Sequence, residues 1–334
     1  MRKFLAFLLS AAVCTSLLTG CAEQQDTGSS TDSSAEEGKA FKVGLVQLME
    51  HTSLNTIREA VLDEFKQLGY TDETLTVDYQ NGLGEQTNLL SICQKFVGDD
   101  VDLIIAIATP AAQTAISVTE GTDIPVVFSA VTNPADVGIQ NPEAPEGHAT
   151  GTSDLIPVDS TLELARQIDP ELETIGLLYN AGEANSISVI EEAKAFCDAN
   201  NLKYEEKALT NISELQQAAQ ALVGNVDAVF TPIDNSIASA MAVLSQVCID
   251  AKIPCYVGAD SMVKDGGLAA VGIEYTELGR NTARMADQLL KGAEVSEVPV
   301  QYFEDFSKFI NTTVAEKIEL EIPAEILENA VTFE

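Results

Sequence analysis

Residues 101–110 read Val-Asp-Leu-Ile-Ile-Ala-Ile-Ala-Thr-Pro, and residues 226–235 read Val-Asp-Ala-Val-Phe-Thr-Pro-Ile-Asp-Asn. Each stretch is a short apolar run that ends at polar residues, which is typical of a buried parallel strand that leads into a helix. The surroundings repeat as well, because Val-Gly-Leu-Val-Gln at 43–47 corresponds to Ile-Gly-Leu-Leu-Tyr at 175–179. The sequence therefore predicts an α/β fold with two doubly wound, Rossmann-like parallel-sheet domains that face each other.

The length of the chain agrees with this repeat, because 334 residues suit two domains of about 130 to 150 residues each. After residue 260 the pattern shows a strand near 268–272, a helix near 276–290 and a tail, which are too little for a third domain. We expect the strand and helix to return to the first domain and the tail to the second, with three crossovers in all. The expected first domain is 41–154 with 266–297, and the expected second domain is 155–265 with 298–334.

The N-terminal segment has the pattern of a secretory signal. Met1-Arg2-Lys3 precedes an apolar stretch that ends at Leu18-Thr-Gly-Cys21, and such a stretch is too short for a membrane span. The last four residues resemble the bacterial lipobox, in which the cysteine is lipidated after cleavage, although a chance cysteine in an apolar leader is the alternative. We expect residues 1–20 to be removed and Cys21 to hold the exported chain at the extracytoplasmic face of the membrane. Residues 21–40 are rich in Ser, Thr, Gly and acidic residues and predict a flexible tether.

Composition excludes several classes of function. The formal net charge of −34 repels nucleic acid and anionic lipid, and no acidic or His-rich motif predicts a metal site. Gly82-Leu-Gly84 follows a strand but lacks the third glycine of a dinucleotide motif, so we expect no cofactor. His51 and His148 are the only histidines, and no nucleophile motif accompanies them.

The cysteines that remain after Cys14 and Cys21 have the pattern of buried small apolar residues rather than of a disulfide framework. Three fall in helical patterns and one in an apolar strand. We expect these four to be unpaired: Cys93, Cys197, Cys248 and Cys255.

The polar residues at the strand ends predict a ligand site between the two domains. Thr109 and Pro110 open a helix, and the amides of a helix N-terminus together with a Thr hydroxyl suit a carboxylate. The corresponding position in the second half carries Asp234, whose carboxylate suits an ammonium group. This pairing of donors with an acid is what an amino acid zwitterion needs, although Thr109 and Asp234 are also typical of ordinary helix caps.

Further candidates follow the other strands or lie at the first crossover. Tyr179 is an aromatic that could stack on a flat ligand, and Glu50 with His51 is the adjacent acid and base pair that an enzyme would need. The complete set of expected ligand-binding residues is Gln47, Glu50, Thr109, Pro110, Ala111, Ser129, Ala130, Thr132, Ser153, Asp154, Tyr179, Asn180, Asn185, Ser186, Asp234, Asn235, Ala259 and Asp260.

From about Val43 to Ala330 the chain resembles the substrate-binding lipoproteins of ABC transporters, in the group that includes tryptophan- and other aromatic amino acid-binding members. The resemblance implies a type I periplasmic-binding-protein fold and no catalysis, and it supports the assignments of Thr109, Ser153 and Asp234. It rests on the stretches 43–51, 106–113, 151–154, 178–180 with 183–186, 232–235 and 272–280.

The function expected from this resemblance is that of an extracytoplasmic receptor that closes on a small ligand and delivers it to a permease and its ATPase. The ligand is expected to be an amino acid, with the aromatic amino acids among the candidates. Three alternatives stay open: a receptor for a nucleoside or sugar-like solute, a sensor that signals to a membrane kinase, and a surface hydrolase or isomerase.

Overall fold

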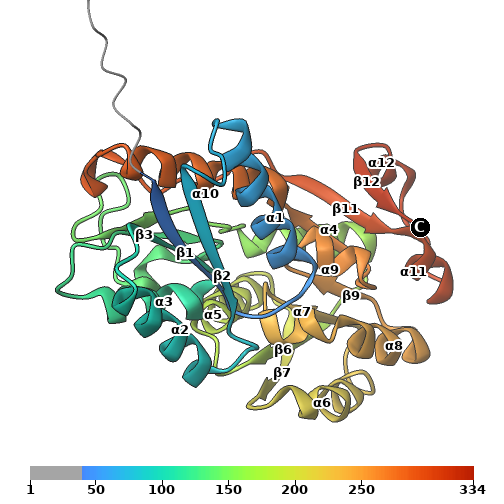
Figure 1. Cartoon of the computed structure of the whole chain (residues 1–334). Helices are drawn as coiled ribbons and strands as arrows, with labels where there is room; N and C mark the ends of the chain where they lie inside the picture. Colours follow the sequence, from blue (N-terminus) through green and yellow to red (C-terminus); the bar gives the residue numbers. More distant parts are fainter. Residues whose placement is uncertain (1–39) are drawn as a thin grey trace, which may run out of the picture. The chain divides into compact units, whose positions relative to one another are not determined.

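The computed structural model describes residues 40–334. The expected signal peptide, the lipidation site Cys21 and all but the last residue of the tether lie outside the described residues. Two β-sheets organise the described part of the chain (Figure 1). None of its helices is long and apolar enough to cross a bilayer.

The first sheet has five strands, all parallel, in the order β2-β1-β3-β4-β5. Its central strand β3 is buried along its whole length, as the apolar run at its position predicts. Helices α1, α2, α3 and α10 pack around this sheet. We call the sheet and these helices the first lobe: β1 (Phe41–Gln47), α1 (Thr52–Gln67), β2 (Leu75–Asn81), α2 (Gln86–Gly98), β3 (Leu103–Ile107), α3 (Thr109–Thr119), β4 (Val126–Ser129), β5 (Ala149–Gly151) and α10 (Tyr275–Leu290), with the 3-10 turn η1 (Pro134–Val137).

The second sheet has seven strands in the order β12-β11-β10-β9-β8-β6-β7. Its pairs are parallel except that β10 and β11 run antiparallel. We call this sheet with its helices the second lobe: α4 (Val158–Ile168), β6 (Thr174–Asn180), α5 (Ala184–Ala199), β7 (Lys203–Leu209), η2 (Ile212–Glu214), α6 (Leu215–Leu222), β8 (Ala228–Thr231), α7 (Asn235–Ser239), α8 (Met241–Ala251), β9 (Cys255–Val257), α9 (Asp260–Lys264), β10 (Ala269–Gly272), β11 (Ser307–Asn311), α11 (Thr312–Lys317), α12 (Ala324–Leu327) and β12 (Ala330–Phe333); η3 (Val295–Glu297) follows α10.

The chain passes between the lobes three times, after β5, after β10 and after α10. The fold class is therefore confirmed, but the placement of the strand at 268–272 in the first domain was wrong. This strand, β10, pairs with β9 at Ala269 and Tyr256 and lies antiparallel to β11, so it belongs to the second sheet. The helix that follows it, α10, packs on α1 in the first lobe.

A glycine allows α10 to approach α1 closely. A Cβ atom at Gly279 would lie 2.6 Å from the carbonyl oxygen of Ile57 and 2.8 Å from Cβ of Ala60, distances that real side chains do not tolerate. The absence of a side chain at Gly279 therefore allows α1 to pack directly against α10. This packing helps to position the residues just before α1 and at its start.

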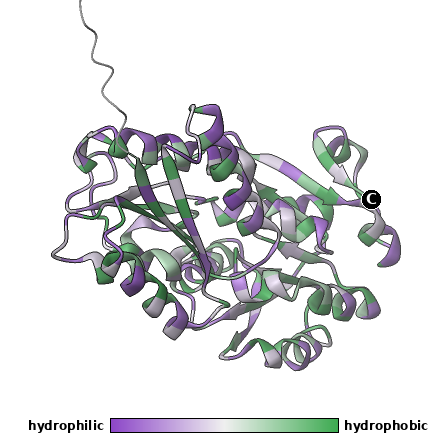
Figure 2. Cartoon of the chain, viewed as in Figure 1, coloured by the Kyte–Doolittle hydropathy of each residue, from purple (hydrophilic) through white to green (hydrophobic). Residues whose placement is uncertain are grey.

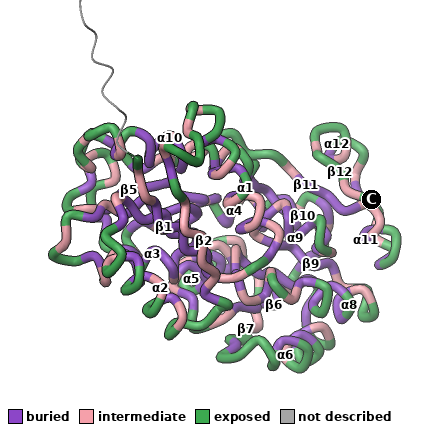
Figure 3. The backbone as a smooth tube through the Cα atoms, viewed as in Figure 1, coloured by how far each residue is buried: buried purple, intermediate pink, exposed green. Residues whose placement is uncertain are grey.

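The core follows the strands of both sheets. In Figure 2 the central strands are hydrophobic while polar residues alternate along the outer helices, and Figure 3 shows the same strands as buried. The largest fully buried side chains include Phe96 and Phe128 in the first lobe and Tyr256 and Phe230 in the second. The four cysteines of the described part are buried and free.

Candidate functional site

A small cavity lies between the two lobes. Residues that come directly after strands of both sheets line it. Its volume in this structure is about 10 Å³, far below the ~300–1,000 Å³ of typical small-molecule pockets, so the lobes must move somewhat apart to accommodate a ligand. Its walls come from both lobes and from two crossovers. The lining residues are His51, Ser53, Leu54, Thr109, Ala130, Thr132, Asp154, Asn185, Ile233, Asn235 and Tyr275.

Three lining residues carry a buried polar atom that has no hydrogen-bond partner. These atoms are His51 Nδ1 and Thr109 Oγ1 in the first lobe and Asn185 Oδ1 in the second. A buried polar group without a partner costs about 1–3 kcal/mol, and buried polar groups in native proteins are almost always paired. Three such atoms around one cavity therefore indicate that a bound ligand supplies their partners.

The other atoms of these side chains explain which hydrogen bonds the free atoms can make. The Asn185 amide group donates through Nδ2 to the carbonyl of Ile233 at 2.8 Å, which leaves Oδ1 as an acceptor. The Thr109 hydroxyl is free to donate. The cavity thus presents an acceptor from the second lobe and a donor from the first.

His51 bonds across the two lobes. Its Nε2 lies 3.1 Å from Asn235 Oδ1, and because that oxygen can only accept, Nε2 carries the proton. Burial lowers the pKa of His51, against the opposing effects of the Asn235 hydrogen bond and of Glu183 and Asp265. The ring is therefore neutral in this structure, and Nδ1 is a second acceptor in the cavity.

Asp154, at the first crossover, supplies a buried carboxylate. It is 1% exposed and accepts hydrogen bonds from the hydroxyls of Thr132 at 2.9 Å and Tyr275 at 3.1 Å. Burial raises its pKa, against these two hydrogen bonds. Within residues 40–334 no ion pair includes this carboxylate, so a cationic group in the cavity would be its natural partner.

Thr109 is the first residue of α3 and lines the same cavity. The amides at a helix start have no partner within the helix, and the helix dipole makes this end favourable for an anion. Two alanines beside it have left-handed backbone angles, Ala108 with φ 82° and Ala130 with φ 54°. Such strain in residues other than glycine concentrates at functional sites.

Several hydrogen bonds join the lobes around the cavity in addition to that of His51. Thr52 Oγ1 donates to Asp265 Oδ2 at 2.8 Å, and the hydroxyls of Ser53 and Ser261 form a short hydrogen bond. Elsewhere, Ser188 Oγ donates to Asp136 Oδ2 at 3.1 Å. The lobes are therefore in a closed arrangement.

Six of the eighteen residues expected from the sequence line the cavity: Thr109, Ala130, Thr132, Asp154, Asn185 and Asn235. Pro110 and Ala111 lie in the first turn of α3, directly after Thr109. Ala259 and Asp260 lie at the start of α9. Glu50 and Asn180 line a separate open groove together with Leu83 and Thr210.

The structure gives Asp234 a different task from the one expected. Its Oδ1 accepts from the backbone N–H of Ile237 and caps α7, while Oδ2 accepts from the Asn180 N–H and the Ser186 hydroxyl. Burial, together with the neighbouring carboxylate of Glu183, raises the pKa of Asp234 to about 7. Asp234 therefore does not line the cavity, and both of its oxygens already accept hydrogen bonds within the second lobe, whereas Asp154 does line it.

Four other expected residues make hydrogen bonds within their own surroundings rather than facing the cavity. Ser129 Oγ bonds to Thr282 Oγ1 at 2.7 Å, and Ser153 Oγ donates to the carbonyl of Thr132 at 2.9 Å. Tyr179 donates to Glu206. Gln47 donates through Nε2 to the Met49 carbonyl and to Asn55. These residues support the strand ends without lining the cavity.

Sequence reasoning missed five lining residues: His51, Ser53, Leu54, Ile233 and Tyr275. The first three follow β1 and begin α1, so the rule that ligands bind beyond strand ends could have included them. Ile233 is an apolar residue that directly precedes Asp234 and Asn235, so no polar group marks it as a candidate. Tyr275 follows β10, and its role depends on the crossover from β10 to α10.

Asp260 provides a prediction for the pH dependence of stability. Its Oδ1 is buried without a partner, and burial raises its pKa to about 6. Because the pKa of Asp260 is higher in the folded protein, protonation of this side chain favours the folded state. This contribution to stability is complete below the unfolded pKa of about 3.8, and it is lost as the pH rises through about 6. Asp260→Asn should therefore raise the thermal midpoint relative to wild type by about 2 °C more at pH 8 than at pH 5. Equal differences at the two pH values would contradict this.

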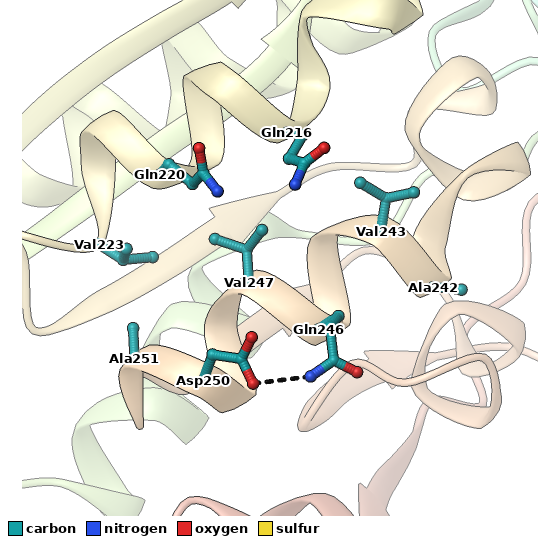
Figure 4. A pocket seen from close by; sticks show the side chains of 9 residues that line it. All are labelled: Gln216, Gln220, Val223, Ala242, Val243, Gln246, Val247, Asp250 and Ala251. Atoms are coloured by element: carbon teal, nitrogen blue, oxygen red, sulfur yellow. Dashed lines mark hydrogen bonds between the residues drawn. The ribbon is translucent and has the colours of Figure 1, made fainter.

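An open groove between α6 and α8 differs from this cavity, because no buried polar atom in its lining lacks a partner. Figure 4 shows this groove, lined by Gln216, Val243 and Val247, with Gln246 bonded to Asp250 at 2.7 Å. In the described part of the chain no cluster of three or more His, Cys, Asp or Glu residues is placed to hold a metal ion.

Comparison with known proteins agrees with the geometry. A family model described as ABC transporter substrate binding protein matches residues 42–333. A protein named tyrosine-binding protein from Clostridioides difficile is 33% identical over 323 residues, which are 96% of this chain and 93% of that protein.

Two solved structures with 34% identity differ in their likeness to this chain. An ABC domain from Streptococcus pneumoniae in complex with L-Trp has a TM-score of 0.84, with 88% of this chain and 99% of that chain covered. The ligand-free, open structure of a substrate binding protein with adhesive properties from Clostridium difficile, with the same coverage, has a TM-score of 0.68. The greater likeness to the complex agrees with the closed arrangement of the lobes. The resemblance and the type I periplasmic-binding-protein fold are confirmed, and the chain belongs to the ABC transporter substrate binding protein family.

Proposed function

We propose that this chain captures one free amino acid with an aromatic side chain in the cavity between its lobes and delivers it to an ABC importer. The observation that carries the proposal is the convergence of the Asp154 carboxylate with the three unpartnered atoms of His51, Thr109 and Asn185. This set has the polarity of a zwitterion site, with acceptors for an ammonium group and donors for a carboxylate.

The ammonium group of the ligand binds Asp154 and faces the two neutral acceptors, His51 Nδ1 and Asn185 Oδ1. The carboxylate accepts hydrogen bonds from the Thr109 hydroxyl and the first turn of α3. These contacts come from both lobes, so a bound amino acid stabilises the closed form relative to the open one.

The remaining lining supports an apolar or aromatic side chain. Leu54, Ala130 and Ile233 present apolar surface, and Tyr275 supplies an aromatic ring that suits edge or offset stacking. The relatives favour the same class, since one is named for tyrosine and the other was solved with L-Trp.

We further propose that the chain performs no catalysis. The enzyme alternative depended on Glu50 beside His51, but Glu50 is exposed and lines the separate open groove, while His51 lines the cavity. The partners are then a permease and a cytoplasmic ATPase. Lipidation of Cys21 would tether the exported chain to the outer face of the membrane, with residues 21–40 as the linker.

A thermal-shift screen of the mature chain with Cys21→Ser tests the ligand class. A ligand at about 100 times its dissociation constant adds about 2.7 kcal/mol of stability, so tyrosine, tryptophan or phenylalanine should raise the midpoint by several degrees. Tyramine and 3-(4-hydroxyphenyl)propionate, which lack the carboxylate and the ammonium group respectively, should shift it less than tyrosine. A shift with a sugar or nucleoside, and with no amino acid, would contradict the proposal.

A further inference from the structure

The hydrogen bond between His51 and Asn235 joins residues from opposite lobes. His51 directly precedes α1 of the first lobe, and Asn235 is the first residue of α7 in the second. Both side chains are buried, at 9% and 4% exposure. The 3.1 Å contact between Nε2 and Oδ1 can therefore exist only when the lobes are closed.

The Asn235 amide is not free to turn over. Its Nδ2 donates to Glu183 Oε2 at 2.6 Å, and its backbone N–H donates to the same oxygen at 3.0 Å. The other oxygen, Oε1, accepts from the N–H of Ser236 at 2.9 Å and from its hydroxyl at 2.7 Å. Both Glu183 oxygens thus accept hydrogen bonds from N–H groups, so Glu183 holds the amide nitrogen of Asn235 toward itself and leaves Oδ1 turned toward His51.

This chain of hydrogen bonds decides the state of the imidazole. Oδ1 of Asn235 has no proton to give, so Nε2 of His51 must be the donor. In a neutral ring the second nitrogen is then an acceptor. That nitrogen, Nδ1, is buried, has no hydrogen-bond partner among residues 40–334 and belongs to a residue that lines the cavity.

We propose that Glu183 and Asn235 are positioning residues that fix His51 as its Nε2–H tautomer on closure, so that Nδ1 accepts a hydrogen bond from the ligand. This inference rests on the proposed function in one respect, that the ligand occupies this cavity. The acceptor is created when the lobes close, because in the open form His51 loses Asn235. A ligand that offers an N–H or O–H donor to Nδ1 is therefore held only by the closed receptor, which couples recognition to closure.

Protonation of His51 opposes this state. A protonated ring carries an N–H at Nδ1. Two donors, this N–H and the donor group of the ligand, then face each other, and Nδ1 can no longer accept a hydrogen bond. The charged and titratable groups around the ring are Glu183 and Asp265 of the second lobe, with Asp154 and Tyr275 across the cavity. The open form takes up its proton near the ordinary pKa of about 6.5, whereas burial lowers the pKa of His51 in the closed form.

The sign of the pH effect follows from that difference. Above about pH 6.5 both forms are neutral at His51, and the affinity is independent of this group. As the pH falls below that value the open form gains a proton that closure must release. The affinity should therefore fall by up to about tenfold per pH unit until the lower pKa of the closed form is reached.

Nitrogen NMR of the mature chain labelled with 15N-histidine tests the tautomer directly. The protein has two histidines, and His148→Gln, which lies outside the cavity, assigns the His51 signals. With tyrosine bound at pH 7.5 we expect a protonated Nε2 and an unprotonated Nδ1. The Nδ1–H tautomer, or a protonated ring, in the bound protein would overturn the proposal.

Two variants and a pH series extend the test. In Glu183→Gln the new side-chain amide can both accept and donate hydrogen bonds, so it no longer fixes the orientation of the Asn235 amide. We expect mixed His51 tautomers and about tenfold weaker binding. His51→Gln should bind more weakly at every pH and show a shallower decline below about pH 6.5 than wild type, because only the protonation of Asp154, whose pKa burial raises, then remains to weaken binding. Calorimetry from pH 5 to 8 on wild type and His51→Gln remains decisive if Glu183→Gln does not fold.

The outcomes separate this inference from the proposed function. If wild type binds no amino acid at any pH, the proposed function fails and this inference with it. If wild type binds an aromatic amino acid with the same pH profile as His51→Gln, the receptor function stands and the positioning role of Glu183 and Asn235 is wrong.

Discussion

Asp154→Asn should lower the affinity of the chain for the proposed amino acid ligand by about 100-fold or more. Loss of one partner of a buried, hydrogen-bonded charge pair costs about 2–5 kcal/mol, and Asp154 is the acidic residue in the cavity lining. The fold should survive, because Asn keeps the shape of the side chain and can still bond the hydroxyls of Thr132 and Tyr275. Isothermal titration calorimetry with wild type and variant measures the ratio.

A control for Asp154 is available in α10 of the first lobe. Asp287 is also buried and also accepts from a tyrosine hydroxyl, that of Tyr70 at 2.9 Å, but it does not line the cavity. Asp287→Asn should leave the affinity unchanged. In addition, Asp154→Asn should weaken the binding of 3-(4-hydroxyphenyl)propionate little, since this analogue has no ammonium group to lose. Equal losses for tyrosine and for the analogue would show that Asp154 does not bind the ammonium group.

Thr109→Val has opposite effects on stability and on binding. The Thr109 hydroxyl is buried without a partner, so replacing it with a methyl group should raise the stability of the ligand-free protein by about 1 kcal/mol. The same change removes a donor to the ligand carboxylate and should weaken binding by about 10- to 100-fold, as the loss of a hydrogen bond to a charged group does. Chemical denaturation and calorimetry on the same samples measure the two effects.

Thr114 is the control for this variant, because it lies on the same helix and is also buried. Its hydroxyl donates to the Pro110 carbonyl at 2.8 Å and accepts from Gln86 at 2.9 Å. Thr114→Val should therefore lower stability and leave the affinity unchanged. If Thr109→Val lost stability as well, its hydroxyl would have a structural partner, and the carboxylate site at α3 would be wrong.

The fold was predictable because short apolar runs such as 103–107 that end at polar residues are typical of strands buried on both faces. The sequence did not show to which sheet β10 belongs. This four-residue strand, Ala269–Gly272, is apolar and would suit either sheet, and its place is decided by pairing with β9 and with the distant β11. Such pairing depends on backbone geometry that no local pattern encodes.

The site was predictable in part for a similar reason. The rule that ligands bind at the carboxyl ends of strands pointed to Thr109, Thr132, Asp154 and Asn185, which line the cavity, but it did not show which other side chains at each end face the cavity. Asp234 and Asn235 show the difference, because the first caps α7 and the second turns toward His51 in the other lobe. These two residues are neighbours in the sequence, yet one caps a helix and the other lines the cavity. The geometry of the start of α7 determines which of them faces the cavity.

A crystal structure of the mature chain with the aromatic amino acid that gives the largest thermal shift tests the central claim most directly. We expect the amino acid in the cavity between the lobes, with its ammonium group at Asp154 and its carboxylate at Thr109 and the first turn of α3. A ligand bound in the groove between α6 and α8, or one in the cavity with its carboxylate toward Asp154, would contradict it.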